Sequence, residues 1–127
     1  MSNLDITSDI VVKAIPVYLE KESNSMEPKH VFVYHIEIFN NGDETVQLLR
    51  RHWDIQDNGG EDYIVEGDGV IGRQPHIAPG QSHRYQSFCV LKGMTGSMKG
   101  WFEFVRADGM PVKALIPKFE LVSHLLN

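Results

Sequence analysis

A strict alternation of side chains over residues 30–40 is the feature that most limits what this chain can fold into. Phe32, Tyr34, Ile36 and Ile38 would share one face of an extended segment, and the residues between them would share the other. A period of two predicts a β-strand, because apolar positions on a helix recur every three or four residues. The Asn-Asn-Gly-Asp sequence that follows is typical of a hairpin turn, since Asn and Gly accept positive φ angles at little cost.

Six further segments have the composition or alternation of strands, and turn residues separate most of them. They cover residues 9–20, 45–57, 62–66, 82–91, 98–107 and 112–121. Within 45–57, Leu49, Trp53 and Ile55 are expected on one face. We find no helical apolar stripe and no strand–helix–strand unit. The pattern predicts an all-β fold, a seven-stranded antiparallel β-sandwich of the fibronectin type III or immunoglobulin-like kind.

Composition limits the class of protein further. The chain has 127 residues, 42% of them apolar, and a net charge of −5. This predicts one folded domain over residues 9–127 after a flexible N-terminal tail of residues 1–8, and no nucleic-acid binding. No apolar stretch of about 18 residues and no secretory signal is visible, so we expect no membrane span. Cys89 is the single cysteine, which excludes an intramolecular disulfide and favours a cytoplasmic location.

An acidic run lies between Asp54 and Asp68, with six acidic residues and no Lys or Arg. We interpret it as a solvated edge that aids solubility. Two other interpretations stay open: a docking surface for a basic partner, and a weak site for a divalent cation.

The acidic run ends in a glycine motif. Residues 67–72, Gly-Asp-Gly-Val-Ile-Gly, match the GxGxxG spacing of nucleotide-binding loops. That mechanism requires the last glycine to open a helix whose amides face the phosphates, and Pro79 would break such a helix. The motif therefore favours a bend. The alternative is a phosphate site, with these candidate ligand-binding residues: Gly67, Asp68, Gly69, Gly72 and Arg73.

Other reactive residues form no recognisable catalytic pattern. His52 with Asp54, and His35 with Glu37, would share strand faces, but two ligands are too few for a zinc site. Cys89 and Ser87 are expected in mid-strand, where a nucleophile is rarely accessible. Arg51 and Trp53 should share a face, with Trp53 in the core between the sheets. Arg51 is then expected to pair with a carboxylate or to stack on an aromatic ring at the sheet edge. We expect no catalytic residue, no metal site and no cofactor.

Taken together, several ordered blocks resemble the ApaG family. They are Arg-His-Trp-Asp-Ile-Gln-Asp at 51–57, the glycine block at 65–75, Ile-Ala-Pro-Gly at 77–80, Tyr-Gln-Ser at 85–87, Gly-Ser-Met-Lys-Gly at 96–100 and Ile-Pro-Lys-Phe-Glu-Leu at 116–121. The resemblance extends from about Ile10 to Asn127. One departure is Phe88, where the family usually has Gly after Tyr-x-Ser.

The resemblance implies a fibronectin type III-like fold, a link to cobalt and magnesium efflux or resistance, and no assigned catalytic residues. The same domain occurs in F-box proteins and in a DNA-polymerase-interacting protein, where it looks like a partner-binding module. Our hypothesis is a non-catalytic module whose loop from Gly67 to Pro79 faces an unknown protein partner. The alternative is binding of pyrophosphate or a dinucleoside polyphosphate at Gly67–Gly72. Unpaired edge strands would also allow a homodimer.

Overall fold

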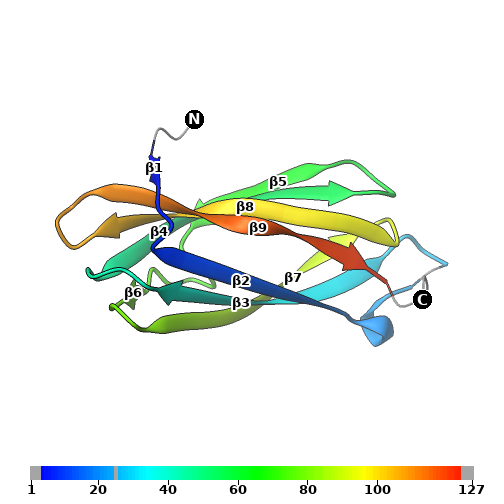
Figure 1. Cartoon of the computed structure of the whole chain (residues 1–127). Helices are drawn as coiled ribbons and strands as arrows, with labels where there is room; N and C mark the ends of the chain where they lie inside the picture. Colours follow the sequence, from blue (N-terminus) through cyan, green and yellow to red (C-terminus); the bar gives the residue numbers. More distant parts are fainter. Residues whose placement is uncertain (1–3, 25, 124–127) are drawn as a thin grey trace.

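The computed structural model describes residues 4–24 and 26–123. Its strands are β1 (Asp5–Ile6), β2 (Ile10–Tyr18), β3 (His30–Asn40), β4 (Val46–Asp57), β5 (Tyr63–Asp68), β6 (His76–Ile77), β7 (Ser82–Leu91), β8 (Thr95–Arg106) and β9 (Pro111–Val122), with a short 3₁₀ helix, η1, at Glu20–Glu22. The larger sheet has the order β1-β9-β8-β4-β5, with β6 also paired to β4, and the smaller sheet is β2-β3-β7 (Figure 1). The all-β sandwich predicted from the alternation is confirmed. In the described part of the chain, no helix is long and apolar enough to cross a membrane.

The two shortest strands were missed by the sequence prediction. β1 and β6 have two residues each, which is too short to show a period, so the described residues form nine strands where seven were expected. β1 pairs with β9 in parallel, whereas the prediction was purely antiparallel. Residues 5–6 of the expected tail, residues 1–8, thus belong to a sheet, while residues 1–3 lie outside the described range.

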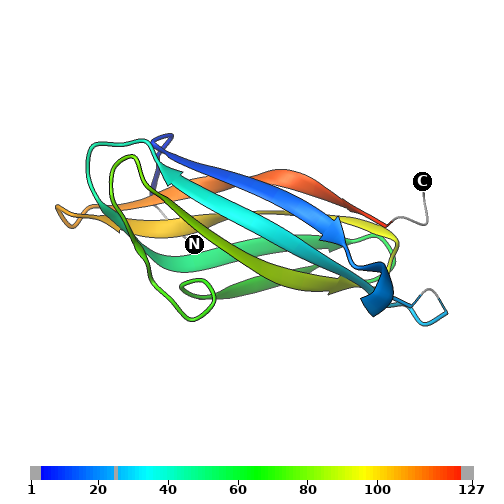
Figure 2. The same cartoon turned by 90° about the horizontal axis from the view of Figure 1, so that it is seen from below.

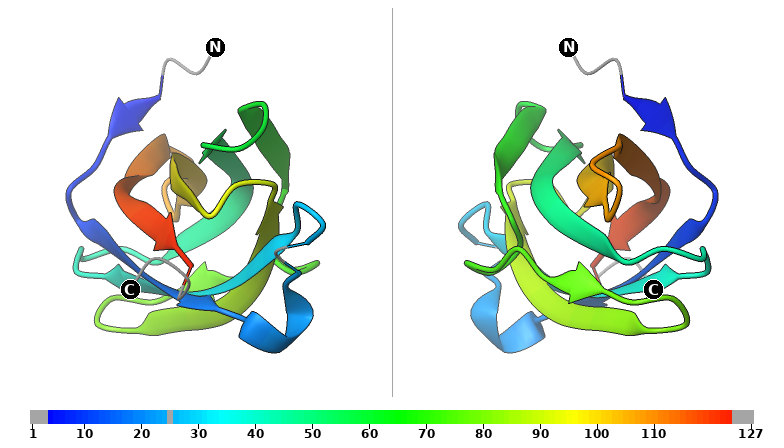
Figure 3. Two further views of the ribbon diagram at one scale, coloured as in Figure 1. Left: turned by 90° about the vertical axis from the view of Figure 1, so that its right-hand side faces the viewer. Right: turned by 90° about the vertical axis from the view of Figure 1, so that its left-hand side faces the viewer.

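The two sheets are in contact along one side of the sandwich and are more widely open along the other. β2 packs against β9 and joins the two sheets there. At the opposite side, β5 and β7 are the outermost strands of their sheets (Figure 3). One hydrogen bond spans this side, from the Tyr63 hydroxyl to the Val90 carbonyl, at 3.3 Å. Side chains that point inward near this open side are therefore within reach of solvent.

The core between the sheets is organised around Trp53, which is 1% exposed. Its ring makes edge-to-face contacts with Tyr34, Phe102 and Phe119, at centroid distances of 5.3, 6.2 and 5.9 Å. Such pairs contribute about 0.5–1.5 kcal/mol beyond simple burial. The four rings come from β3, β4, β8 and β9, so they connect both layers.

A β-bulge in β4 changes which of its side chains face inward. The pairing of β4 with β8 slips between Leu48 and Arg50, which places one extra residue on β4. Leu48 is buried before the bulge, and Trp53 is buried after it. Leu49 therefore does not share the face of Trp53, contrary to the prediction from strict alternation. Arg51 does share that face, as predicted, and it lies two residues before the central tryptophan.

Asp57 fastens two turns together at one end of the sandwich. Its buried carboxylate accepts hydrogen bonds from the backbone amides of Gly59 (2.9 Å), Lys92 (2.7 Å) and Gly93 (2.9 Å). Burial on its own would raise the pKa of Asp57. The three amide hydrogen bonds and the charge of Lys92 outweigh burial, so the net pKa lies below the ordinary value. The β4–β5 and β7–β8 turns thus depend on this charge.

Replacing Asp57 by Asn should destabilise the protein by about 2–4 kcal/mol, because three part-buried hydrogen bonds lose their charged acceptor. The matched control is Asp108→Asn in the β8–β9 turn, where the side chain accepts one exposed amide hydrogen bond from Met110; we expect a loss within about 0.5 kcal/mol. Urea unfolding measures both.

The stabilising effect of Asp57 should also depend on pH. A carboxylate whose pKa is lower in the folded than in the unfolded state stabilises the fold fully only above its unfolded-state pKa, so the Asp57 effect should shrink below about pH 4. Equal losses in the two variants would contradict this role.

Candidate functional site

The glycine motif forms a tight corner between β5 and β6 (Figure 2). Val70 and Arg73 exchange both backbone hydrogen bonds, at 2.8 and 3.0 Å. The two residues between them, Ile71 and Gly72, have φ angles of 47° and 71°. Positive φ at both central positions closes a two-residue turn of the hairpin type. The motif is therefore a bend in an extended chain.

This corner differs from a nucleotide-binding loop in two respects. The amides of Gly69, Val70 and Arg73 donate to backbone carbonyls, so they are not directed at an external anion. The chain then runs from residue 73 to β6 without entering a helix, so the helix dipole that would favour phosphate is missing from this segment.

Arg51 holds the corner from inside the sandwich. Its Nη1 atom donates to the carbonyls of Asp68 and Gly69, both at 3.0 Å. The guanidinium lies across Gly67, where a Cβ atom would come within 2.9 Å of Nη2. The absence of a side chain at Gly67 leaves room for the arginine, and the arginine in turn fixes the path of the chain beyond it.

Arg51 also lines a pocket between the two sheets, which we call the corner pocket. Its volume is about 270 Å³. The lining consists of Tyr34 from β3, Arg51 and Trp53 from β4, Tyr85 and Ser87 from β7, and the corner residues 68 and 70–72. A volume of this size suits a small group or one side chain better than a nucleotide.

The five predicted site residues are divided by the fold. Asp68 and Gly72 line the corner pocket, whereas Gly67 and Gly69 contact the guanidinium of Arg51. Arg73 is exposed and is not among the lining residues. Burial lowers the pKa of His83 on β7, and the positive charge of Arg73 lowers it further.

Three residues that carry hydroxyl groups, Tyr34, Tyr85 and Ser87, line the corner pocket. The Tyr85 hydroxyl is buried and is without a hydrogen-bond partner among the described residues. The Tyr34 hydroxyl is hydrogen-bonded to Ser87. Burial raises the pKa of both tyrosines, more than the charge of Arg51 lowers it, so both are protonated at neutral pH. The pocket is thus lined by two protonated tyrosines and one arginine.

The two candidate nucleophiles are in unreactive surroundings. Burial raises the pKa of the Cys89 thiol to about 12, and the charge of Asp57 adds to this, so the thiolate is scarce at neutral pH. The Ser87 hydroxyl is hydrogen-bonded to a phenol, which is not a general base at neutral pH.

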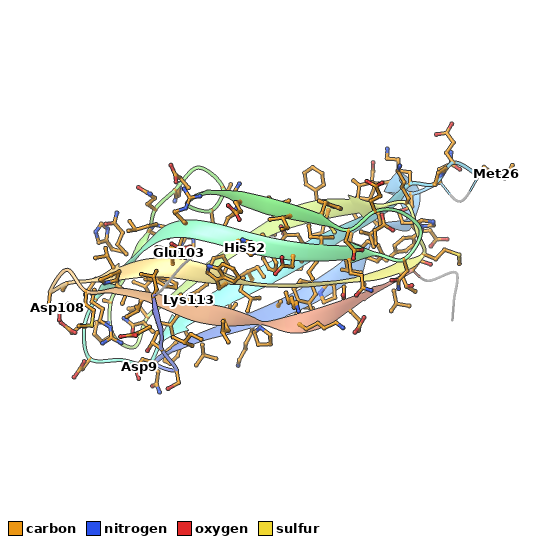
Figure 4. All side chains as sticks on the ribbon, turned by 90° about the horizontal axis from the view of Figure 1, so that it is seen from above. Asp9, Met26, His52, Glu103, Asp108 and Lys113 are labelled. Carbon is orange, nitrogen blue, oxygen red and sulfur yellow. The ribbon has the colours of Figure 1, made fainter. Side chains whose placement is uncertain are left out.

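His52 belongs to a surface cluster on the outer face of the larger sheet. One ring nitrogen lies 2.8 Å from Glu66 and the other 3.1 Å from Asp54. The ring stacks on Trp101 at 3.8 Å, and Lys113 lies 4.6 Å from the centroid of the same indole (Figure 4). Both imidazole nitrogens are thus engaged by carboxylates. Among residues 4–24 and 26–123, no group of three or more His, Cys, Asp or Glu could hold a metal ion.

Sequence reasoning missed that Arg51 and Tyr85 belong to one pocket. It expected Arg51 on the face of Trp53, and it placed residues 85–87 within the 82–91 strand. Alternation alone supports both placements. What it could not supply was the pairing of the strands, which brings β7 opposite the glycine corner.

Gly69 and Gly72 allow a matched test of this corner. A Cβ atom at Gly69 would lie 2.1 Å from the Arg73 carbonyl oxygen, whereas one at Gly72 would meet nothing within 4 Å. Both have positive φ, so Gly72→Ala should cost about 1 kcal/mol and Gly69→Ala about 3 kcal/mol or more. Denaturant unfolding measures the two losses. Similar losses would mean that the corner does not have this geometry.

Comparison with known proteins gives a consistent result. The model of the ApaG domain family matches residues 20–106. The protein ApaG of Methylobacterium sp. (strain 4-46) is 43% identical over 120 residues, which cover 94% of this chain and 92% of that protein. A crystal structure of a Bordetella pertussis protein assigned as ApaA is 34% identical, with a TM-score of 0.88 over 91% of this chain and 94% of that one. The chain belongs to the ApaG family.

Proposed function

We propose that this chain is a non-catalytic, cytoplasmic interaction module, and that the glycine corner with its pocket is the surface that contacts a protein partner. The observation that carries the proposal is the unneutralised charge of Arg51. Of the residues that the structure describes, no Asp or Glu forms an ion pair with it, and its partners are neutral carbonyls. A half-buried charge without a counterion is costly unless a ligand supplies one.

The shape of this region supports the same proposal. Ile71 stands at the tip of the corner and is 60% exposed, although it is a large apolar residue. An apolar tip beside a polar pocket is a common arrangement at protein–protein interfaces, where an apolar contact supplies affinity and polar groups supply orientation. Cys89 and Ser87 are in surroundings that do not activate a nucleophile, so covalent catalysis is not favoured here.

The resemblance to ApaG proteins suggests that the cellular role involves cobalt and magnesium homeostasis. Such a role would be indirect, acting through the partner, because the described part of the chain has no helix that spans a membrane and no cluster of metal ligands.

Photo-crosslinking tests the proposal. A photoreactive amino acid at Ile71 should give a discrete adduct with one partner in cells. The matched control is Ile6, which is also 60% exposed but lies in β1, at the opposite edge of the larger sheet. Adducts that are equal at the two positions, or absent from both, would contradict the proposal.

A second candidate function is pyrophosphate binding at Gly67–Gly72. One observation favours it: no described hydrogen bond uses the amides of Ile71 or Gly72, and Arg73 follows directly. If this function is correct, millimolar pyrophosphate should shift the amide resonances of these residues. If the corner serves only as a bend and a protein contact, the resonances should stay in place.

A further inference from the structure

The corner pocket combines two features that are independently unfavourable without a ligand. The first is the guanidinium of Arg51, whose charge has no carboxylate partner among the described residues. The second is the hydroxyl of Tyr85, a buried donor with no acceptor in that same part of the chain. Each defect costs free energy, and one bound anion would remove both.

We propose that the corner pocket binds a single carboxylate group, held by Arg51 and by the hydroxyl of Tyr85 as a second donor. This inference rests on the proposed function and names the chemistry by which a partner is recognised. The carboxylate would come from an acidic side chain or from the carboxyl terminus of a polypeptide.

The donors are of the kinds that bind a carboxylate. A guanidinium has five N–H groups, and two hydrogen bonds from Nη1 of Arg51 hold the corner. The remaining N–H groups can bind a planar carboxylate in a bidentate manner, and a phenol O–H can bind one of its remaining lone pairs. The phenol is available as a donor because burial keeps Tyr85 protonated.

The charge of the pocket favours one negative charge over several. Arg51 is the one cation among the described residues that line it, and Asp68, which also lines it, carries a negative charge. The charge of Asp68 is balanced by Arg50, which is not part of the pocket and which pairs with Asp68 at 2.7 Å. A single carboxylate would balance Arg51, whereas a pyrophosphate would bring excess negative charge next to an acidic surface.

The neighbourhood of the corner pocket would help an acidic segment to approach. Arg73 is exposed at the corner and forms no ion pair with the described residues, unlike Arg84, which pairs with Glu37. Arg73 directly follows Gly72, which lines the pocket, so its unpaired charge is close to the pocket. Long-range attraction should nevertheless be weak, because the chain as a whole carries a net charge of −5.

The test adds four short peptides to the whole chain and measures their binding by NMR titration. An N-acetylated, C-amidated peptide with one central Glu is compared with its Gln counterpart, and an all-Ala peptide with a free carboxyl terminus is compared with its amidated form. We expect binding in about the millimolar range for at least one carboxylate peptide and none for either neutral control. The shifts should appear at the Arg51 side chain and the Tyr85 ring. The peptide that binds identifies the source of the carboxylate.

Tyr85→Phe is the decisive variant, because its hydroxyl has no described partner in the protein and its loss should not lower stability. It should weaken carboxylate binding about tenfold. Tyr63→Phe, which removes a hydroxyl bonded to Val90 outside the corner pocket, should change affinity less than about twofold. Arg51→Met should abolish binding, with circular dichroism checking that the fold persists.

The outcomes separate this inference from the proposed function. Peptides that fail to bind, or that bind the Tyr85→Phe variant equally well, overturn the carboxylate site, even if the Ile71 crosslink is found. Carboxylate binding without a crosslink at Ile71 supports the pocket and contradicts the protein-interaction role.

Discussion

The hydrogen bonds from Arg51 to the carbonyls of Asp68 and Gly69 are the interaction on which the rest of this site depends. A guanidinium directed into a sandwich is unfavourable unless its N–H groups find acceptors. The glycine corner supplies them, and the missing side chain at Gly67 supplies the space. The bulge in β4, the glycine motif and the corner pocket are thus parts of one arrangement.

This arrangement explains why glycine spacing is a poor guide to function here. The spacing GxGxxG fits a loop that cradles phosphates, but only when a helix follows. In this chain the same spacing closes a hairpin turn, in which the backbones of Val70 and Arg73 are hydrogen-bonded to each other. Its glycines serve the path of the backbone and the packing of Arg51. The chemistry of the pocket comes instead from residues far away in sequence, on β4 and β7.

The sequence predicted the strands well and the pocket poorly, for physical reasons. Alternation is a local property, so the bounds of β3 and β7 were predicted to the residue. β1 and β6 were not predicted, because two residues show no period. Leu49 was assigned to the wrong face, because a bulge breaks the alternation without leaving a local signal. Arg73 was favoured over Arg51 as the ligand-binding arginine because it adjoins the glycines in sequence. Strand pairing, which no local pattern encodes, brings Arg51 and Tyr85 together.

Amide hydrogen exchange tests the central claim most directly, namely that the glycine corner is tied into the sheet by its own backbone and by Arg51. The amides of Gly69, Val70 and Arg73 donate to carbonyls, so they should exchange slowly, while those of Ile71 and Gly72 should exchange rapidly. Rapid exchange at all five positions would show a corner open to an external ligand and would contradict the account.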